Sequence, residues 1–497
     1  MDVQGRPVVV VGLAREGAAL ASYLARRGAH VIATDLKPAS AFGDQLTALA
    51  RAGVELALGG HPTSLLEGRE MVFVSPGVPF DAEFLNAARA RGIPLSTESR
   101  LFCQLCRAPI VGITGSSGKT TTTTLVGEIL KAAGWTTWVG GNIGQPLIEM
   151  VDHIQADDQV VMELSSFQLE YFHPSANAHV TGGQAAWLPL LAGWSPEVSA
   201  ILNITPNHLD RHPSMADYIH AKRAIVAYRR PGSVAVLNLD DEVTRAMAET
   251  LAAPLHWFSR LASVERGACL VGQGREARLV VRGAACEQTV CTVSEVRLRG
   301  EHNLSNILAA CAIADALGAP VEAMRQVCIT FTGVSHRLEL VGEIAGVRYY
   351  NDSIATSPER LVAALKSFEE PIILLAGGRD KHLPWEEAAR LMLERTRHVI
   401  LFGEATELIA QALTRAQEGR PAGAPMVHRC VTLEDAVCVA AQVARPGDVV
   451  LLSPGCTSFD AFKDFAERGE RFRQAVGQLS APGGCFPDLA RQTGGRS

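Results

Sequence analysis

No stretch of this sequence approaches the ~20 consecutive apolar residues that a membrane-spanning helix needs. Residues 1–6 also lack the basic and then apolar layout of a secretory signal. Runs of five or more like charges do not occur, and the formal net charge is only −6. These absences argue against a membrane or a nucleic acid as a partner. We expect a cytoplasmic protein, and we expect it to work as a monomer.

Cysteine pairs at zinc-site spacing are scarce as well. Of the eleven cysteines, Cys103 and Cys106 form one C-x-x-C, and no second pair lies at the distance that a zinc site requires. We interpret these two as buried thiols on one helical turn and expect no metal there.

Alternating strand and helix patterns run through almost the whole chain of 497 residues. At roughly 150 residues per domain, this length predicts about three domains. The alternation predicts an α/β protein with parallel sheets flanked by helices. The predicted strands include Val8–Val11, His30–Thr34, Met71–Ser75, Pro109–Thr114, Val160–Leu164, Ala200–Ile204, Ile372–Ala376, His398–Phe402 and Val449–Leu452.

Two segments interrupt this pattern. Cys269–Val296 has short alternating runs broken by glycine and predicts a small β-hairpin insert. Gly182–Pro196 reads as an inserted apolar loop, to which we assign no function. We place the domains at residues 1–98, 99–333 and 334–497, and expect the glycine- and proline-rich residues 481–497 to form a flexible tail.

A glycine-rich loop carries the clearest chemistry. Gly115–Thr120 (G-S-S-G-K-T) follows a predicted strand and opens the predicted helix Thr120–Ala133. Backbone N–H groups, a helix N-terminus and a lysine bind phosphate oxygens in such loops, and the threonine hydroxyl can hold Mg²⁺. The general P-loop has glycine where this chain has Ile113, so only its second half matches. The loop predicts an ATP or GTP site.

Three further side chains are candidates for this chemistry. Glu163 ends an apolar strand, where open α/β sheets bind ligands, and could hold Mg²⁺ opposite the loop. Taken alone, Glu163 is equally a surface residue. His208 follows the strand Ala200–Ile204 and Lys222 lies in a helical stretch. By themselves these two would be a structural histidine and a solvated lysine.

A second glycine-rich turn follows the first strand. Gly12–Gly17 (G-L-A-R-E-G) lacks the middle glycine of the dinucleotide fingerprint, and Asp35 ends the next strand at about the spacing of a ribose or base contact. A tight strand–helix turn without a ligand explains the pattern equally well. Two such turns suggest two nucleotides, or one nucleotide and one nucleotide-linked substrate.

Several motifs then occur in a fixed order, namely Thr114–Thr122, Gly141–Gly144, Glu163–Glu170, Asn203–Arg211, Lys222 and Glu301–Asn306. Together they resemble the Mur ligases of peptidoglycan synthesis. The run Leu452–Phe465, followed by Glu467–Gly469, is similar to the members that add D-glutamate. The resemblance spans nearly the whole chain. It also accounts for Ile113, because the loop of the family is G-x-x-G-K-[ST].

This resemblance implies a Rossmann-like N-terminal domain that binds the UDP part of the substrate, a central P-loop ATPase domain, and a Rossmann-like C-terminal domain that receives the amino acid and closes over ATP. It implies an ATP-dependent ligase that adds D-glutamate to UDP-N-acetylmuramoyl-L-alanine through an acyl phosphate. Two Mg²⁺ ions and a carbamylated lysine are implied as well.

Carried over residue by residue, the resemblance implies a set of roles. Catalysis would rest on Lys119, Glu163, His208 and Lys222, and the metal ligands would be Thr120, Glu163, His208 and Lys222 as its carbamate. ATP would contact Gly115, Ser116, Ser117, Gly118, Lys119, Thr120, Thr121, Asn303, Asn306, Arg337 and Asp352. The UDP-substrate would contact Gly12, Arg15, Asp35, Ser75, Gly77, Asn142, Ser165 and His208. Glutamate would contact Thr356, Lys381, Ser458 and Phe459 or Phe465.

Two departures from the family pattern concern different parts of the substrates, and the first of them, at Ile354, keeps the amino acid open. Ile354 stands where the glutamate-adding members have lysine, so a cation near the incoming substrate is missing, unless Arg337 or Arg379 replaces it. Arg15-Glu16 and Leu36-Lys37 differ from the usual uracil-contacting residues. L-glutamate or another amino acid therefore stays an alternative substrate.

Three other functions fit the sequence less well. A non-catalytic UDP-sugar-binding paralogue is disfavoured by the intact Lys119, Glu163, His208 and Lys222. Folylpolyglutamate synthase has a similar centre but would not explain the N-terminal nucleotide domain. A P-loop GTPase should carry a guanine-reading N-K-x-D, which the sequence lacks.

Overall fold

The computed structural model describes residues 2–181, 187–208, 211–283, 286–298, 300–381, 383–418 and 425–479. The expected tail and the first residues of the apolar insert, 182–186, lie outside these ranges. The chain divides into two units, residues 1–331 and 332–497. The domain boundaries at 98 and 333 stay predictions.

The first sheet of the N-terminal unit has five parallel strands in the order β3-β2-β1-β4-β5. Its central strand, β1, consists of one proline followed by four valines. Val8 and Val10 pack into one core, and Val9 and Val11 pack into another. Both faces of the sheet are covered, so the strand is apolar at successive positions instead of alternating. The strands are β1 Pro7–Val11, β2 His30–Asp35, β3 Glu55–Leu58, β4 Met71–Val74 and β5 Leu95–Ser96, and the helices are α1 Arg15–Arg26, α2 Gln45–Arg51 and α3 Glu83–Ala90.

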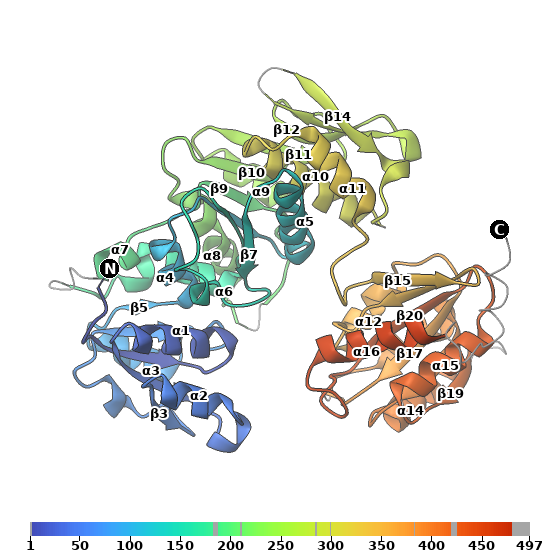
Figure 1. Ribbon diagram of the computed structural model, residues 1–497, viewed down its shortest axis with the longest axis horizontal. Coiled ribbons are helices and arrows are strands. Elements are labelled where there is room, and N and C mark those ends of the chain that lie inside the picture. The colour runs from blue at the N-terminus through green and yellow to red at the C-terminus, as the bar shows by residue number, and fades with distance from the viewer. Residues whose placement is uncertain are drawn as a thin grey trace. The chain divides into compact units, whose positions relative to one another are not determined.

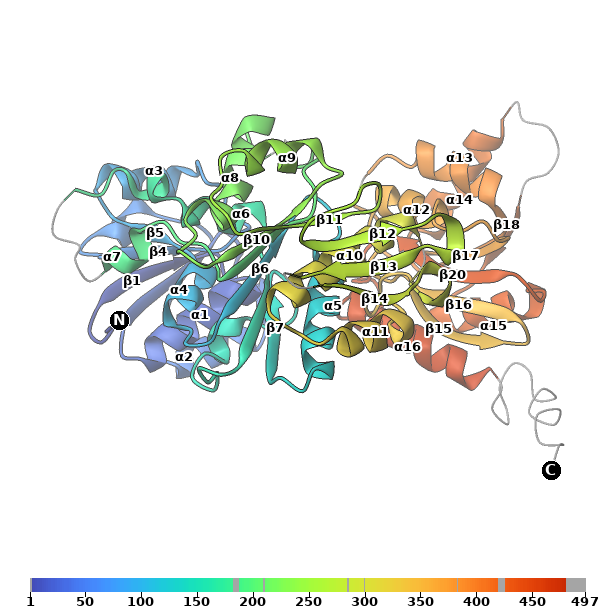
Figure 2. The same ribbon diagram turned by 90° about the horizontal axis from the view of Figure 1, so that it is seen from above.

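The second sheet of this unit has nine strands in the order β14-β13-β12-β11-β10-β9-β6-β8-β7. Its strands are β6 Ile110–Thr114, β7 Thr137–Gly141, β8 Gln159–Glu163, β9 Val198–Ile201, β10 Val234–Asn238, β11 Leu255–Ser259, β12 Gly267–Val271, β13 Arg278–Arg282 and β14 Glu287–Thr292. Its helices are α4 Glu98–Leu105, α5 Lys119–Ala132, α6 Ser166–Leu169, α7 Leu188–Leu191, α8 Met215–Ala227, α9 Glu242–Ala248, α10 Glu301–Ala316 and α11 Val321–Thr330. Helices α5, α10 and α11 share one core on this sheet, while α8 packs into the other (Figure 2).

The predicted β-hairpin is present, but it extends the large sheet and does not stand apart from it. Strand β12 pairs parallel with β11 and antiparallel with β13, and β13 pairs antiparallel with β14. Alternating runs indicate strands, but they do not say which edge of which sheet those strands join.

The described part of the apolar insert, residues 187–196, packs into the protein core. Trp187 is fully buried, and its ring meets Phe73 of β4 edge-on at 6.1 Å. Arg100 of α4 is also buried and donates to the backbone oxygens of Pro189 and Ala192. The insert therefore bridges the two sheets of the N-terminal unit.

The C-terminal unit holds one six-stranded sheet in the order β15-β16-β20-β17-β18-β19 (Figure 1). Only β15 runs antiparallel to its neighbour, so the predicted α/β class is confirmed in all three sheets. The strands are β15 Glu339–Ile344, β16 Val347–Asn351, β17 Ile372–Gly377, β18 Thr396–Phe402, β19 Met426–Arg429 and β20 Val449–Gly455. The helices are α12 Pro358–Leu365, α13 Glu386–Arg395, α14 Thr406–Gln417, α15 Leu433–Val443 and α16 Phe465–Gln478. Among the described residues, no helix is both long and apolar enough to cross a membrane.

Candidate active site

The glycine-rich loop joins the buried strand β6 to helix α5. Gly118 has a left-handed φ of 79°, and a Cβ there would lie 2.2 Å from Oδ1 of Asn306. Glycine is therefore required both by the backbone and by the close approach. The Nζ of Lys119 donates to the backbone oxygens of Gly115 and Ser116, at 3.0 and 3.3 Å. Because α5 begins at Lys119, its first N–H groups lie at the loop, an arrangement that binds phosphate.

Side chains from two other segments support this loop. The N–H of Ser117 donates to Oδ1 of Asn203 at 2.9 Å. Asn306, against Gly118, donates to Asn303 at 3.0 Å, and their helix α10 packs beside α5 (Figure 1). The residues predicted to bind ATP in this unit thus lie together: Gly115, Ser116, Ser117, Gly118, Lys119, Thr120, Thr121, Asn303 and Asn306.

Glu163 faces the loop from the end of the neighbouring strand β8. Its carboxylate is 2% exposed and accepts two hydrogen bonds of 2.8 Å, from the hydroxyl of Thr120 and from the amide of Asn142. Parallel pairing of β6, β8 and β7 brings the three ends to one edge of the sheet. The structure therefore joins a predicted metal-ligand pair with a predicted substrate contact.

Lys222 of α8 is buried beneath the same loop, with 1% of its surface exposed. Its Nζ donates to Thr114 Oγ1 at 3.2 Å and to Gly115 O at 2.9 Å, and lies 4.8 Å from the centre of the Tyr218 ring. Burial, then the charge of Lys119, holds the pKa of Lys222 well below its ordinary value. The solvated lysine that the helix pattern suggests is thus wrong, and the neutral amine is favoured.

His208 lies at an exposed turn with a φ of 55°, beside an aromatic cluster. Its imidazole is 5.0 Å from the ring of Phe167 and 6.5 Å from that of Tyr218. The same two rings contact His212, which is 2% exposed. Tyr218 therefore lies between His208 and Lys222. Residues 209 and 210 of the sequence motif lie outside the described ranges.

The N-terminal glycine turn is held by side chains predicted to contact the UDP-substrate. Ser75 donates its hydroxyl to the carbonyl of Gly12 at 2.7 Å, and Asp35 accepts the N–H of Leu13 at 2.7 Å. Gly77 contributes its carbonyl to Arg211 at 3.3 Å. Arg15 is exposed in the first turn of α1. Asp35 thus shapes the turn itself, besides any contact with a ligand.

In the C-terminal unit, Asp352 follows strand β16 and is buried. Burial raises the pKa of its carboxyl to about 7, although it accepts the hydroxyl of Ser453 at 2.9 Å and the N–H of Leu338 at 3.2 Å. Arg337 precedes Leu338, and its positive charge lowers that pKa in part. Arg337 and Asp352 are therefore close together in this unit, and their contacts with the phosphates and ribose of ATP stay a prediction.

The predicted glutamate contacts form a loose group in this unit. Lys381 Nζ lies 3.4 Å from the hydroxyl of Thr356. Ser458 is buried, whereas Phe459 and Phe465 are 61% and 37% exposed. The segment before Ser458 is fixed by a neighbour that the sequence analysis gave no role.

That neighbour is Arg468, whose guanidinium is fully buried. It donates to the backbone oxygens of Cys456 and Thr457 at 3.1 Å each, and to the backbone and side chain of Ser353.

Arg379, considered as a replacement for the missing lysine at Ile354, is held by two hydrogen bonds to Glu404, of 2.8 and 2.9 Å.

Comparison with known proteins identifies the family. The Mur ligase middle domain matches residues 113–314, the Mur ligase glutamate ligase domain 336–456, and the N-terminal domain of MurD-like Mur ligases 6–97. This chain belongs to the Mur ligase family.

Its relatives match over nearly full length. The UDP-N-acetylmuramoylalanine–D-glutamate ligase of Symbiobacterium thermophilum is 43% identical over 95% of this chain and 98% of its own. That of Geotalea daltonii is 42% identical over 98% of this chain and 100% of its own. The UDP-N-acetylmuramate–alanine ligase of Thermotoga maritima shares the fold, with a TM-score of 0.55 at 19% identity over 95% of this chain and 99% of that one.

The metal ligands expected for a Mur ligase fit this chain in part. The hydroxyl of Thr120 and the carboxylate of Glu163 are oxygen donors of the kind Mg²⁺ prefers, and they already touch. The described residues contain no group of three or more His, Cys, Asp or Glu side chains at metal-binding spacing. As an ammonium, Lys222 could not ligate a metal ion.

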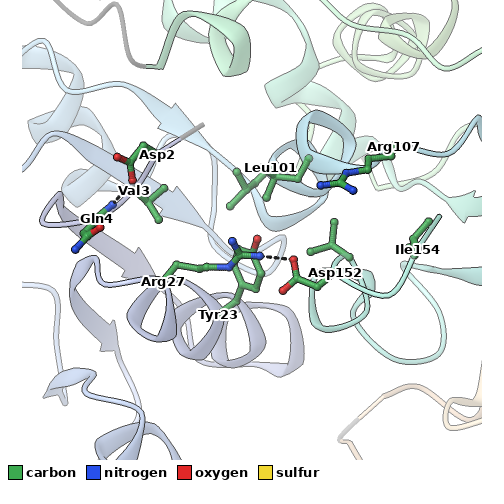
Figure 3. Close-up of a pocket in the computed structure, with 11 residues that line it drawn as sticks. Asp2, Val3, Gln4, Tyr23, Arg27, Leu101, Arg107, Asp152 and Ile154 are labelled. Atoms are coloured by element: carbon green, nitrogen blue, oxygen red, sulfur yellow. Dashed lines mark hydrogen bonds and ion pairs between the residues drawn. The ribbon is translucent and has the colours of Figure 1, made fainter. Parts of the chain in front are cut away.

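A cavity of about 400 Å³ lies elsewhere in the N-terminal unit, between the ends of α1 and α4. Figure 3 shows Arg27 and Asp152 paired across it, with Arg107 facing them. Its lining contains no residue predicted to bind ATP, the UDP-substrate or glutamate. The predicted catalytic residues Lys119, Glu163 and Lys222 lie at the sheet edge beside the loop and do not line this cavity.

Two further residues, Tyr218 and His212, lie beside the predicted site residues His208 and Lys222. Tyr218 lies one helical turn before Lys222, a spacing that puts both side chains on one face of α8, so the i, i+4 pattern could have indicated it. His212 offered no such signal, because its partners Ser166 and Glu170 come from a distant part of the chain.

Proposed function

We propose that this Mur ligase joins D-glutamate to UDP-N-acetylmuramoyl-L-alanine at the expense of ATP, in the cytoplasmic synthesis of peptidoglycan precursors, as a single chain. The observation that carries the proposal is the cluster of Lys119, Thr120, Glu163 and Lys222 at one sheet edge. Relatives of nearly full length that bear this enzyme's name support the choice of substrates.

The proposed reaction has two steps. A substrate carboxylate oxygen attacks the γ-phosphorus of ATP, and the bond to the β,γ-bridging oxygen breaks, which gives an acyl phosphate and ADP. The amine of glutamate then attacks the acyl carbon; phosphate leaves with the bonding electrons and the nitrogen loses a proton. Because the first step brings two anions together, it needs charge neutralisation more than covalent help. Lys119 would supply one positive charge, and Asn142 would orient the carboxylate beside Glu163.

We propose that Thr120 and Glu163 hold one Mg²⁺ ion, and that His208 and Lys222 as a carbamate hold a second. Bound there, the ions would neutralise charge on the transferred phosphoryl group. An ammonium cannot ligate a metal, whereas a carbamate can. Carbon dioxide reacts with a neutral amine, and the burial of Lys222 favours that form.

For the amino acid, we propose that Lys381, Thr356 and Ser458 receive the carboxylates of glutamate. A cation and two hydroxyls suit an anion. Ile354 offers no charge, and Arg379 is engaged by Glu404, so Lys381 would be the main cation of this pocket. Arg337 and Asp352 are proposed to contact the phosphates and ribose of ATP.

Phosphate release by the purified enzyme tests the proposal. With ATP and Mg²⁺ present, we expect release only when UDP-N-acetylmuramoyl-L-alanine and D-glutamate are both added. Omission of either substrate is the matched control. Release with L-glutamate but not D-glutamate would overturn the stereochemical assignment. No release with any amino acid, together with tight UDP-substrate binding, would favour the non-catalytic paralogue.

A further inference from the structure

A buried polar cluster joins the two sheets of the N-terminal unit. It consists of Glu16, Glu98, Ser99 and Gln168, each less than 10% exposed. Gln168 Nε2 donates to both carboxylate oxygens of Glu16, at 3.1 and 3.3 Å, and to Ser99 Oγ at 2.8 Å. Glu98 accepts the hydroxyl of Ser99 at 3.3 Å and the N–H of Ile148 at 3.1 Å. Polar groups buried in this way keep their geometry, because a buried group that loses its partner is left without a hydrogen bond.

The other end of the Gln168 amide is also committed. Its Oε1 accepts the N–H and the hydroxyl of Ser165, both at 2.9 Å, and the N–H of Gln168 donates back to Ser165 Oγ at 3.2 Å. The carboxylate of Glu16 accepts from Nε2, which fixes the orientation of the amide. Ser165, two residues after Glu163, is therefore connected to Glu16 through a single side chain, that of Gln168.

Glu16 belongs to the N-terminal glycine turn, 152 residues away from Gln168. The turn is tightly packed, because a Cβ on Gly17 would lie 1.9 Å from Gly12 O and 2.4 Å from Ser75 Oγ. A shift of the turn when a ligand binds would consequently move Glu16 as well, because the residue lies between Gly12 and Gly17.

We propose that Glu16 is a positioning residue, which acts through Gln168 to set the hydroxyl of Ser165 and so couples the nucleotide turn Gly12–Gly17 to the reacting end of the substrate. The proposal rests on the proposed function, in which the turn holds the UDP part and Ser165 contacts the same substrate. It adds a link between the two ends of that substrate.

Steady-state kinetics of single and double variants test this link. Glu16→Ala removes the acceptor for Gln168, whereas Glu16→Gln keeps an acceptor oxygen without the charge. Asn177→Ala is the matched control: Asn177 is 6% exposed and makes two hydrogen bonds to the backbone of Leu95 in β5, but does not contact Ser165. Kinetic constants for the UDP-substrate and for ATP are measured along with the unfolding temperature.

We expect Glu16→Ala to raise KM for the UDP-substrate about tenfold and to leave KM for ATP unchanged, since one hydrogen bond to a buried group is lost. Glu16→Gln should stay within about threefold of wild type. In a Gln168→Ala background, Glu16→Ala should have no further effect. Asn177→Ala should lower the unfolding temperature and leave both KM values unchanged.

Equal KM changes in Glu16→Ala and Asn177→Ala would show that the cluster is only structural and overturn the proposal, and so would additive effects of the Glu16 and Gln168 substitutions. If the wild-type enzyme releases no phosphate with any amino acid, the proposed function fails instead. The link is then judged by calorimetric affinity for UDP-N-acetylmuramoyl-L-alanine, for which the same order of variants is expected.

Discussion

The buried carboxyl of Glu98 should make the thermal unfolding of the N-terminal unit depend on pH, and Glu98→Gln should remove much of this dependence. Burial, with the nearby charge of Glu16 as the next cause, raises the pKa of Glu98 from 4.5 to about 8. The hydrogen bonds from Ile148 and Ser99 and the charge of Arg15 lower this pKa, but by less. The carboxyl thus keeps its proton in the folded protein at pH values where the unfolded chain has lost it.

The direction of the pH dependence follows from this difference in protonation between the folded and the unfolded state. The stabilising effect of the proton is complete below pH 4.5 and is lost as the pH rises through about 8. At about 1.4 kcal/mol per pKa unit, the difference between a pKa of 4.5 and one of about 8 lowers the free energy of unfolding by at most about 5 kcal/mol at high pH. For a unit of this size, roughly 1–2 °C accompanies each kcal/mol, so the unfolding temperature should change by on the order of 5 °C.

The assay is calorimetry of wild type and Glu98→Gln from pH 5.5 to 9. Glutamine keeps the acceptor for the N–H of Ile148 and cannot ionise. The variant should match wild type or unfold slightly earlier at pH 5.5, and should unfold on the order of 5 °C later at pH 9. Glu128→Gln, at an exposed pair with Lys131, is the control and should track wild type. A difference between Glu98→Gln and wild type that stays constant with pH would refute the reasoning.

Other substitutions probe the proposed centre and the core. Lys222→Ala should remove most activity but leave UDP-substrate binding by calorimetry unchanged; full activity would contradict the carbamate. Glu163→Gln should raise the Mg²⁺ concentration needed for half-maximal phosphate release by about tenfold or more, because a carboxylate ligand is lost; an unchanged Mg²⁺ requirement would argue against this ligand. Gly118→Ala should abolish ATP binding, since its Cβ would meet Asn306 at 2.2 Å; normal nucleotide affinity would contradict this geometry. Trp187→Ala should destabilise the N-terminal unit by about 3–5 kcal/mol in denaturant unfolding; a loss below about 1 kcal/mol would show that the insert does not fill the core.

Local patterns predicted the parts of the site that depend on near neighbours. The valines of β1 and the apolar run before Glu163 indicated buried parallel strands, because such strands need apolar side chains on both faces. The loop Gly115–Thr120 was recognisable from the sequence, because glycines, a lysine and a helix start must be consecutive to surround a phosphate. The strands of the hairpin were visible in the same way, while the sheet they join was not.

Lys222 shows where such patterns stop. Its helix carries mixed residues: the i, i+4 spacing places Lys222 beside Tyr218, but nothing within one turn reports that Nζ lies beneath the loop. The family resemblance pointed to Lys222, but the burial of this lysine follows from the packing of α8 on β6 and β9, which the sequence does not show.

By itself, the sequence determined the α/β class, the phosphate loop and, through its motifs, the family. These features are written in short segments, whose backbone preferences and side-chain periods act over a few residues. Packing between distant segments is what brings Glu16 to Gln168, Asn306 to Gly118 and Arg468 to the segment before Ser458. Each of these contacts forms when packing excludes water and leaves the buried groups only the neighbours that the fold places beside them, a condition that no stretch of sequence contains.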